Sequence, residues 1–174
     1  MHEQRVKIRR GTSHDVESVA KLAAQTFHEA FARDNKADDM ATYVAASFSP
    51  AQIRSELADP RAIFLLAEVS QQTVGYAKLY VHDAPDCITG CDPVELVRLY
   101  VRENWLGSGT GSVLMQACIE EAKTGNHKTL WLGVWENNKH ARTFYQNWGF
   151  IDVGSHEFML GEDVQIDILM ERQL

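Results

Sequence analysis

The sequence is poor in cysteine and in positive charge, and it contains no long apolar run. Its three cysteines among 174 residues are too few, and odd in number, for a disulfide-stapled secreted domain. No run approaches the roughly 20 apolar residues that a membrane helix needs. The first seven residues, Met-His-Glu-Gln-Arg-Val-Lys, lack the apolar core of a signal peptide. These absences predict a cytoplasmic protein with free thiols and no contact with a membrane.

Positive charge is scarce because 17 lysines and arginines are outnumbered by 24 aspartates and glutamates, which gives a formal net charge of −7. A surface of that sign repels the phosphates of nucleic acids and favours a cationic ligand. Cys87 and Cys91 lie close together near His82, but a structural zinc site needs about four ligands and no second pair has suitable spacing. We therefore expect no nucleic-acid partner and no metal.

The order of apolar patterns predicts one α/β domain. At 174 residues the chain suits one well-buried domain and is short for two, so we expect a single domain over residues 1–174. Apolar runs predict strands, and apolar residues at spacings of three and four predict helices. The order of these elements predicts a mixed sheet with helices packed on it. The strands are expected over residues 6–9, 62–69, 73–81, 95–101, 130–135, 150–153 and 164–170, and the helices over 15–31, 39–48, 50–58, 112–124 and 137–148.

Residues 95–115 predict a strand, a glycine loop and a helix. The apolar run is followed by Gly107, Gly109 and Gly111 in alternation, and a helical pattern starts at Ser112. The first N–H groups of a helix lack intrahelical acceptors and lie at the positive end of its dipole, and glycines let a phosphate approach them. The loop is therefore a candidate anion site, although a tight turn that needs glycine backbone angles has the same pattern.

The spacing of the glycines narrows the choice of phosphate ligand. Dinucleotide folds carry G-x-G-x-x-G, and nucleoside triphosphate sites carry G-x-x-x-x-G-K followed by Ser or Thr. The spacing here is G-x-G-x-G with no lysine nearby. Nucleoside triphosphate chemistry is therefore disfavoured.

Three stretches of the chain, taken together, are more specific than the glycines alone. They are Val97-Arg-Leu-Tyr-Val101, Leu106-Gly-Ser-Gly-Thr-Gly-Ser-Val-Leu114 and Val134-Trp-Glu-Asn-Asn-Lys-His-Ala-Arg-Thr-Phe-Tyr-Gln-Asn-Trp-Gly-Phe150. Together they resemble the GNAT superfamily of acyl-CoA-dependent N-acyltransferases, and the order of elements resembles it over nearly the whole chain. The resemblance implies an α/β (α+β) fold with a mixed, mostly antiparallel sheet of about seven strands, helices on both faces and splayed central strands.

The resemblance also implies acetyl-CoA as cosubstrate. Leu106 departs from the family pattern, which has Arg or Gln at that position. Because the phosphate contacts of the family come largely from backbone amides, we expect weaker CoA binding rather than none. By resemblance the diphosphate binds Leu106, Gly107, Ser108, Gly109, Thr110, Gly111 and Ser112, and the pantetheine arm enters a gap beside the bulged strand at Leu99, Tyr100 and Val101 and contacts Asn138.

Tyr145 and Glu95 are the candidate catalytic residues. The resemblance implies that Tyr145 lies beside the thioester sulfur, where a tyrosine can protonate the leaving thiolate. Glu95 starts the central strand, where several members of the family carry a carboxylate that removes the amine proton directly or through water. An ordinary glutamate has a pKa of about 4.3, so burial or a water relay has to support this role. The alternatives are a helix tyrosine that packs against the sheet, and a carboxylate at the strand end that is solvated or ion-paired, for example with Arg98.

The acceptor is less well defined by the sequence. Residues 26–31 and 38–43 resemble the bacterial spermidine/spermine acetyltransferases. Surface charges and core aromatics explain the same residues without a ligand. We expect an N-acetyltransferase for the primary amine of a small molecule, with polyamines as one candidate class; the alternatives are acetylation of a protein or peptide, and a non-catalytic CoA-binding sensor. A homodimer is expected only because it is common in the resembled family. A polyamine would be attracted by Glu29, Asp38 and Asp39 and lined by Phe27, Phe31 and Tyr43.

Overall fold

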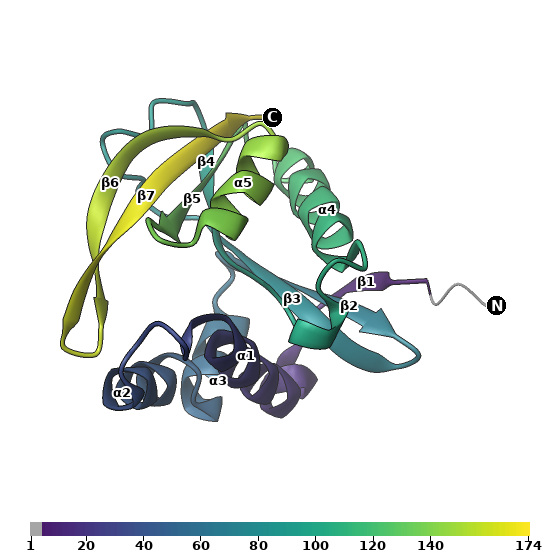
Figure 1. Ribbon diagram of the computed structural model, residues 1–174. Helices are drawn as coiled ribbons and strands as arrows, with labels where there is room; N and C mark the ends of the chain where they lie inside the picture. Colours follow the sequence, from purple (N-terminus) through teal and green to yellow (C-terminus); the bar gives the residue numbers. More distant parts are fainter. Residues whose placement is uncertain (1–4) are drawn as a thin grey trace.

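The computed structural model describes residues 5–174, which form one mixed seven-stranded sheet with helices on both faces (Figure 1). Residues 1–4, which belong to the predicted single domain and to the stretch without a signal-peptide core, lie outside the described residues. The strand order is β1-β2-β3-β4-β5-β7-β6, and among these described strands only β4 and β5 pair in parallel. The predicted fold is confirmed. The strands are β1 (Lys7–Arg10), β2 (Ala62–Val69), β3 (Gln72–Tyr80), β4 (Pro93–Val101), β5 (Thr129–Trp135), β6 (Ile151–Leu160) and β7 (Asp163–Gln173).

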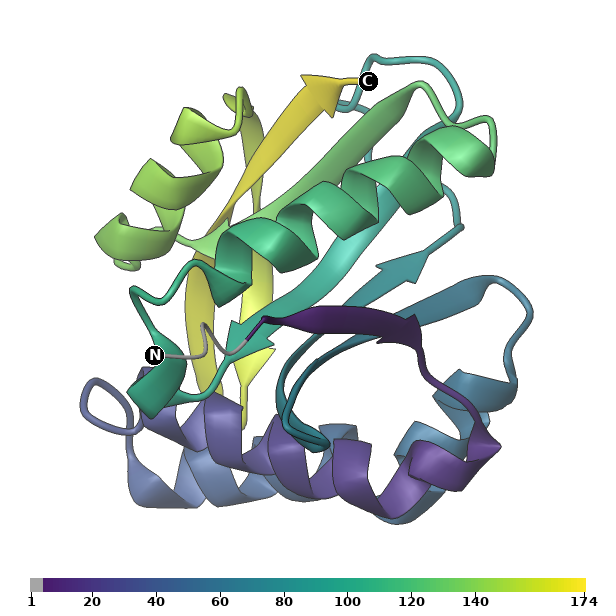
Figure 2. The same cartoon turned by 90° about the vertical axis from the view of Figure 1, so that its right-hand side faces the viewer.

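A different group of helices covers each face of the sheet (Figure 2). Because successive strand residues point to opposite faces, Leu65 belongs to the core beneath α4 and its neighbour Phe64 to the core beneath α1. One face carries α4 (Thr110–Thr124) and α5 (Lys139–Asn147), and the other carries α1 (Val16–Phe31), α2 (Ala37–Ser47) and α3 (Pro50–Ala58).

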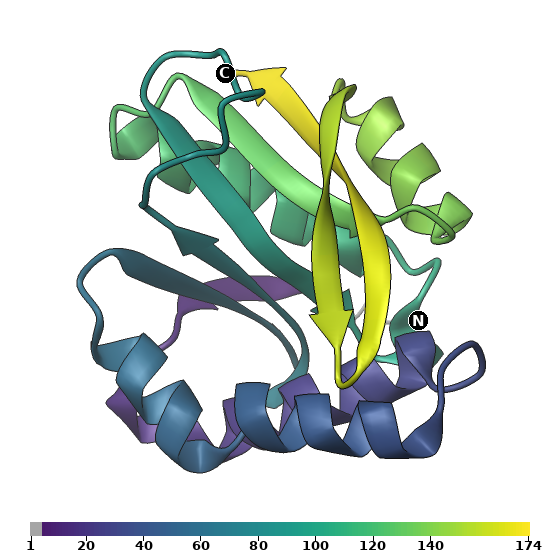
Figure 3. The same ribbon diagram turned by 90° about the vertical axis from the view of Figure 1, so that its left-hand side faces the viewer.

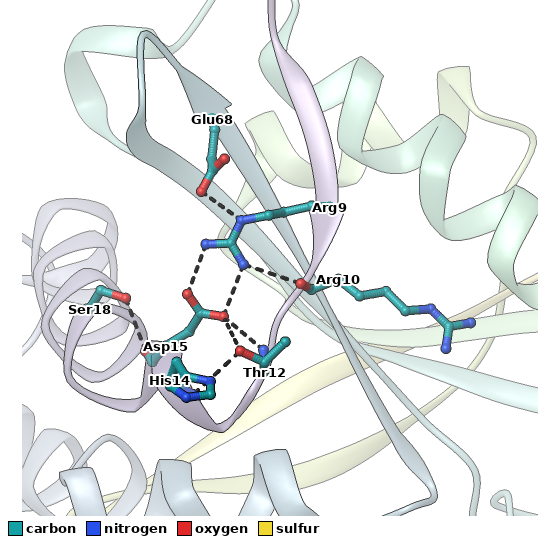
Figure 4. A network of polar contacts seen from close by, with 7 residues as sticks. All are labelled: Arg9, Arg10, Thr12, His14, Asp15, Ser18 and Glu68. Carbon is teal, nitrogen blue, oxygen red and sulfur yellow. Dashed lines mark hydrogen bonds and ion pairs between the residues drawn. The ribbon is translucent and has the colours of Figure 1, made fainter.

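The start of α1 is fixed to the sheet by an ion-pair network (Figure 4). Arg9 on β1 donates hydrogen bonds of 2.9 and 2.8 Å to Asp15 and one of 2.8 Å to Glu68 on β2. Asp15 also accepts the backbone N–H of Thr12 at 2.8 Å, and the predicted capping box is confirmed. A bidentate arginine–carboxylate pair constrains direction as well as distance, so β1 and α1 are held in a fixed relation.

The two central strands separate after a short parallel contact. β4 and β5 pair at only three positions, the last of which joins Glu95 to Trp131. The register of β4 shifts by one residue opposite Lys78 and Leu79 of β3, which leaves Val97 as a bulged residue. A bulge bends its strand, so β4 turns away from β5 beyond this point. The predicted bulge and splay are confirmed.

The carboxy-terminal hairpin is longer than predicted. β6 continues to Leu160 and β7 to Gln173, although the predicted strands end at residues 153 and 170. β6 is an edge strand, and side chains such as Ser155 and Glu157 are exposed on it. The apolar alternation that predicts a strand is therefore weak over this part of the chain.

Candidate active site

The glycine loop enters α4 through two backbone positions that suit glycine. The φ angle is +76° at Gly107 and +87° at Gly109, in a region that L side chains rarely adopt. A Cβ added at either position would meet no heavy atom of residues 5–174 within 4 Å. The two glycines therefore serve the backbone conformation and leave open space in front of the loop, as an anion needs in order to reach backbone donors.

Several N–H groups at the start of α4 are free to bind such an anion. Among residues 5–174, the amides of Gly107, Gly109, Gly111 and Ser112 have no protein acceptor. They lie at the positive end of the dipole of a 15-residue helix. The loop residues thus fit the diphosphate of CoA, although their predicted contacts with it stay a prediction.

The side chains of the loop contribute differently. Ser108 Oγ donates a hydrogen bond of 2.6 Å to the carbonyl of Trp105 and lies 2.8 Å from Thr110 Oγ1. Thr110 is fully buried, so these two side chains stabilise the loop itself. Leu106 is 59% exposed and supplies no polar group at the position where the family pattern has Arg or Gln.

Leu99, Tyr100 and Val101 border the gap between β4 and β5. They pair with β3 on one side, and in the described chain β4 has no partner beyond Glu95 on the other side. One edge of β4 therefore keeps backbone groups for an extended ligand arm, which could add to the sheet as a strand does. The ring of Tyr100 packs edge-on against Phe31 of α1, on the face opposite α4.

Tyr145 is half-buried on α5, and its ring makes edge contacts with Phe144 and Phe150 at centroid distances of 5.5 and 5.8 Å. Burial raises the pKa of its hydroxyl well above the ordinary value, and the neighbouring Cys118 adds to the rise. Burial likewise raises the pKa of Tyr100, with a smaller contribution from Tyr145. Tyr145 therefore stays protonated at neutral pH, which a proton donor requires.

Asn138 caps the first turn of α5. Its Oδ1 accepts the backbone N–H of Ala141 at 3.1 Å. This bond uses the oxygen of the side-chain amide and leaves its NH₂ group as a donor. The predicted contact between Asn138 and the pantetheine arm stays a prediction.

A cavity of about 230 Å³ lies between α1, α2, the central strands and the hairpin of β6 and β7. Residues of both β4 and β5 line it, so it lies at the gap where these strands separate. The tip of the hairpin reaches α2, where Asp39 Oδ1 accepts the N–H of Glu162 at 2.9 Å (Figure 3). The walls are largely aromatic and include Phe27, Phe31, Tyr43, Tyr100, Trp135 and Phe158.

Two carboxylates line this aromatic cavity, Glu95 on β4 and Asp167 on β7. Glu95 Oε2 lies 2.5 Å from His82 Nε2, and Asp167 Oδ2 lies 3.8 Å from His156 Nε2. Burial raises the pKa of Asp167; His156 opposes this rise and Glu95 adds to it. Carboxylates among aromatic faces form an environment that attracts an ammonium group.

The sequence does not identify Asp167 and His156 as cavity residues, because nothing in the local pattern of the hairpin distinguishes them from exposed polar residues. The alternative ion pair between Glu95 and Arg98 is wrong. Arg98 instead binds Glu56 of α3 through hydrogen bonds of 2.7 and 3.1 Å. Arg98 follows the bulge and lies against α3, so its guanidinium contacts the carboxylate of Glu56 and not that of Glu95.

The residues that the sequence suggests for polyamine binding fall into two groups in the structure. The three aromatic residues line the cavity. The three carboxylates do not: Asp38 is exposed, Asp39 holds the hairpin, and Glu29 accepts the N–H of Glu103 at 2.8 Å. Negative charge in the cavity comes from Glu95 and Asp167 instead.

The three cysteines are free thiols, and Cys118 is buried on the face of α4 that packs against the sheet. Over residues 5–174, no cluster of three or more His, Cys, Asp or Glu side chains is arranged to hold a metal. In the same part of the chain, none of the helices combines the length and the apolar character needed to cross a membrane.

Comparison with known proteins identifies relatives that match between two thirds and nearly all of this chain. An uncharacterised N-acetyltransferase of Lactobacillus delbrueckii subsp. lactis is 31% identical over 169 residues, covering 97% of this chain and 98% of the relative. The spermine/spermidine N(1)-acetyltransferase of Bacillus subtilis is 28% identical over 146 residues, covering 66% of this chain and 95% of the relative. The PaiA N-acetyltransferase of Thermoplasma acidophilum, solved with coenzyme A, has the same fold, with a TM-score of 0.80, 18% identity and coverage of 98% and 99% of the two chains.

The model of the acetyltransferase (GNAT) family matches residues 19–150, which is more than half of the chain. The matched region contains the glycine loop, both central strands and α5. The predictions of an acetyl-CoA-dependent acetyltransferase and of its cosubstrate are thereby confirmed. The chain belongs to the GNAT family of acetyltransferases.

Proposed function

We propose that the protein transfers the acetyl group of acetyl-CoA to the primary amine of a small molecule, by direct attack in a ternary complex. The observation that carries the proposal is the cavity at the gap between β4 and β5, where Glu95 and Asp167 lie among aromatic rings. A cation fits there because carboxylates attract its charge and aromatic faces attract it further. The whole chain, residues 1–174, acts as one N-acetyltransferase domain in this proposal.

The donor side of the site is supported by the free amides at the start of α4 and by the unpaired edge of β4. The amides of Gly109, Gly111 and Ser112 would hold the CoA diphosphate, and the edge at Leu99 and Val101 would pair with the pantetheine arm. These two features lie on either side of η2 (Glu103–Trp105), so one ligand can reach both. The thioester would then lie near Tyr145.

Glu95 and Tyr145 divide the proton transfers. A lysine-like amine has a pKa of about 10.4, so its deprotonation at pH 7 costs about 4.6 kcal/mol. Glu95 accepts that proton, the amine nitrogen bonds to the thioester carbon, and the carbon–sulfur bond breaks. Tyr145, which its raised pKa keeps protonated, donates a proton to the departing sulfur, and the second proton of the amine nitrogen replaces it.

Polyamines are one acceptor class within this proposal. The similarity to the spermine/spermidine N(1)-acetyltransferase of Bacillus subtilis supports them, as does the second cavity carboxylate, Asp167. One carboxylate can accept the proton of the reacting amine while the other binds a second ammonium group. A monoamine would use only Glu95.

A thiol-release assay with acetyl-CoA and a panel of polyamines, amino acids, aminoglycosides and peptides tests the proposal. We expect turnover with at least one small amine and faster turnover with that amine than with any peptide. If the acceptor is a polyamine, Asp167→Asn should raise its KM about tenfold or more, because the carboxylate partner of the second ammonium group is lost. Asp38→Asn, which removes an exposed carboxylate of α2, serves as the control. Turnover with peptides alone, or CoA binding without turnover on any amine, would overturn the proposal.

The cytoplasmic location and the homodimer also remain proposals. The three free cysteines suit a reducing compartment. Size-exclusion chromatography with light scattering measures the oligomeric state directly.

A further inference from the structure

The carboxylate of Glu95 has two different environments. It lines the acceptor cavity, and its Oε2 lies 2.5 Å from Nε2 of His82. Among residues 5–174, its other oxygen, Oε1, has no hydrogen-bond partner and is free to meet an amine. Glu95 therefore connects the cavity to a histidine outside it.

His82 follows β3 and is not part of the cavity wall. Its side chain is 32% exposed, against 19% for Glu95, so the pair runs from a more enclosed group to a more exposed one. The imidazole stacks on the ring of Tyr80 at a centroid distance of 5.1 Å and lies 5.5 Å from the ring of Trp131. These two contacts fix the plane of the imidazole and keep Nε2 directed at the carboxylate.

The other ionisable groups near this pair have partners of their own. Lys78 is bound to Glu56 at 3.0 Å, and Asp167 lies 3.8 Å from His156. The hydroxyl of Tyr80 donates to Asp59 at 3.2 Å. His82 is thus the neighbour of Glu95 that combines direct contact with access to solvent.

We propose that His82 acts through Glu95: it carries the proton of the acceptor amine from Glu95 to solvent. This inference rests on the proposed function. Each turnover consumes an ammonium and a thioester and produces an amide, a thiol and one proton. The nitrogen loses two protons: one replaces the proton that Tyr145 gives to sulfur, and the other passes to Glu95. Glu95 transfers it to the unprotonated Nε2 of the neutral imidazole, and the imidazolium that forms releases a proton to water, which restores the carboxylate and the neutral imidazole for the next turnover.

Two substitutions of His82 test the relay. His82→Gln keeps a side-chain amide that can bond to Glu95 but cannot carry a proton, and it should lower kcat about tenfold with the KM of the amine and of acetyl-CoA within about twofold. The loss should shrink as the pH rises, because hydroxide then removes the proton without the relay. His82→Ala should recover activity when imidazole is added, a recovery that a purely structural role does not produce. His28→Gln, on the exposed surface of α1, is the matched control.

A measurement without substrate checks the pair itself. In acidic solution, where both nitrogens of the imidazole carry a proton, the short contact between Nε2 and Glu95 predicts a strongly downfield imidazole N–H resonance in the proton NMR spectrum of the free protein. This resonance should be lost in both His82→Gln and Glu95→Gln and kept in His28→Gln. Thermal melts confirm that each variant is folded. Unchanged kcat for His82→Gln in an active protein, or His82→Ala that imidazole does not restore, would overturn the relay alone. A wild-type protein that acetylates no amine would overturn the proposed function and the relay with it.

Discussion

Glu95 and Trp131 form the last residue pair between the two central strands. On the amino-terminal side of this pair, β4 and β5 are joined by a parallel ladder. On its carboxy-terminal side they separate around a cavity with aromatic walls. One residue therefore ends the ladder and also brings a carboxylate to the cavity. Donor binding, acceptor binding and proton transfer in the proposed reaction all depend on the separation of the two strands at this point.

The hydroxyl of Tyr145 is expected to act in the chemical step and not in binding. Tyr145→Phe should lower kcat by about 10- to 100-fold, because the departing sulfur loses its proton donor, with the Kd of CoA within about twofold. Steady-state thiol release and calorimetric titration of CoA measure the two quantities. Tyr76→Phe is the control, since Tyr76 is fully buried and its hydroxyl has no partner among residues 5–174. Equal kcat values for Tyr145→Phe and the wild type would remove Tyr145 from the mechanism.

Substitution of two glycines with similar positive φ angles distinguishes the loss of stability from the loss of CoA binding. The φ angles of Gly109 and Gly149 are +87° and +84°, so alanine at either position should lower the free energy of unfolding by about 1 kcal/mol. Only Gly109→Ala should also weaken CoA binding, by about tenfold, because it disturbs the amides that face the diphosphate. Urea unfolding and CoA titration of both variants provide the comparison. Similar CoA affinities for the two variants would show that the loop is only a turn.

The exposed Leu106 offers a gain-of-binding experiment. Leu106→Arg introduces a side-chain donor of the kind found in the family pattern and should tighten CoA binding about fivefold, since one added hydrogen bond contributes about 1 kcal/mol. Ile151→Arg adds the same charge at a position of similar exposure, 62% against 59%, and should leave the Kd unchanged. Titrations at low and high salt measure both. An equal gain in the two variants would mean that general charge attraction, and not a contact at the loop, is responsible.

The ion pair between Arg9 and Asp15 makes the free energy of unfolding depend on pH. Hydrogen bonding to Arg9 is the largest cause that lowers the pKa of Asp15 from 3.8 to about 2. A carboxyl group whose pKa is lower in the folded state stabilises above its unfolded pKa, and this contribution disappears as the pH falls from about 4 towards 2. Asp15→Asn should therefore cost about 1 to 2 kcal/mol at pH 7, a range that allows for the exposure of Arg9, and little near pH 2. Urea unfolding across this pH range measures the difference, with Asp38→Asn as the control; an equal cost at pH 7 and near pH 2 would contradict the assignment.

Local sequence signals predicted most of the fold. Thr12 and Asp15 form the predicted capping box, and the glycines at 107 and 109 adopt the backbone angles that the loop requires. These features depend on residues close together in the chain, and so their patterns are readable from sequence. The hairpin was predicted too short because its outer strand is polar and exposed, which removes the apolar alternation that marks a strand.

The acceptor side of the site could not be predicted in the same way. The bulge at Val97 changes which residues of β4 share a face, so that Arg98 and Tyr100 line the cavity together with Glu95. Asp167 enters the cavity only because β7 inserts between β5 and β6. Both facts depend on strand pairing between distant parts of the chain, which no local pattern encodes.

The central claim is that the amides at the start of α4 bind the CoA diphosphate and thereby direct the thioester to Tyr145. A crystal structure of the complex with acetyl-CoA tests it most directly. The account predicts diphosphate oxygens on the amides of Gly109, Gly111 and Ser112, the pantetheine arm between β4 and β5, and the sulfur within about 3.5 Å of the Tyr145 hydroxyl. A bound cosubstrate that leaves these amides without a partner, or a Tyr145 hydroxyl directed into the core away from sulfur, would contradict it.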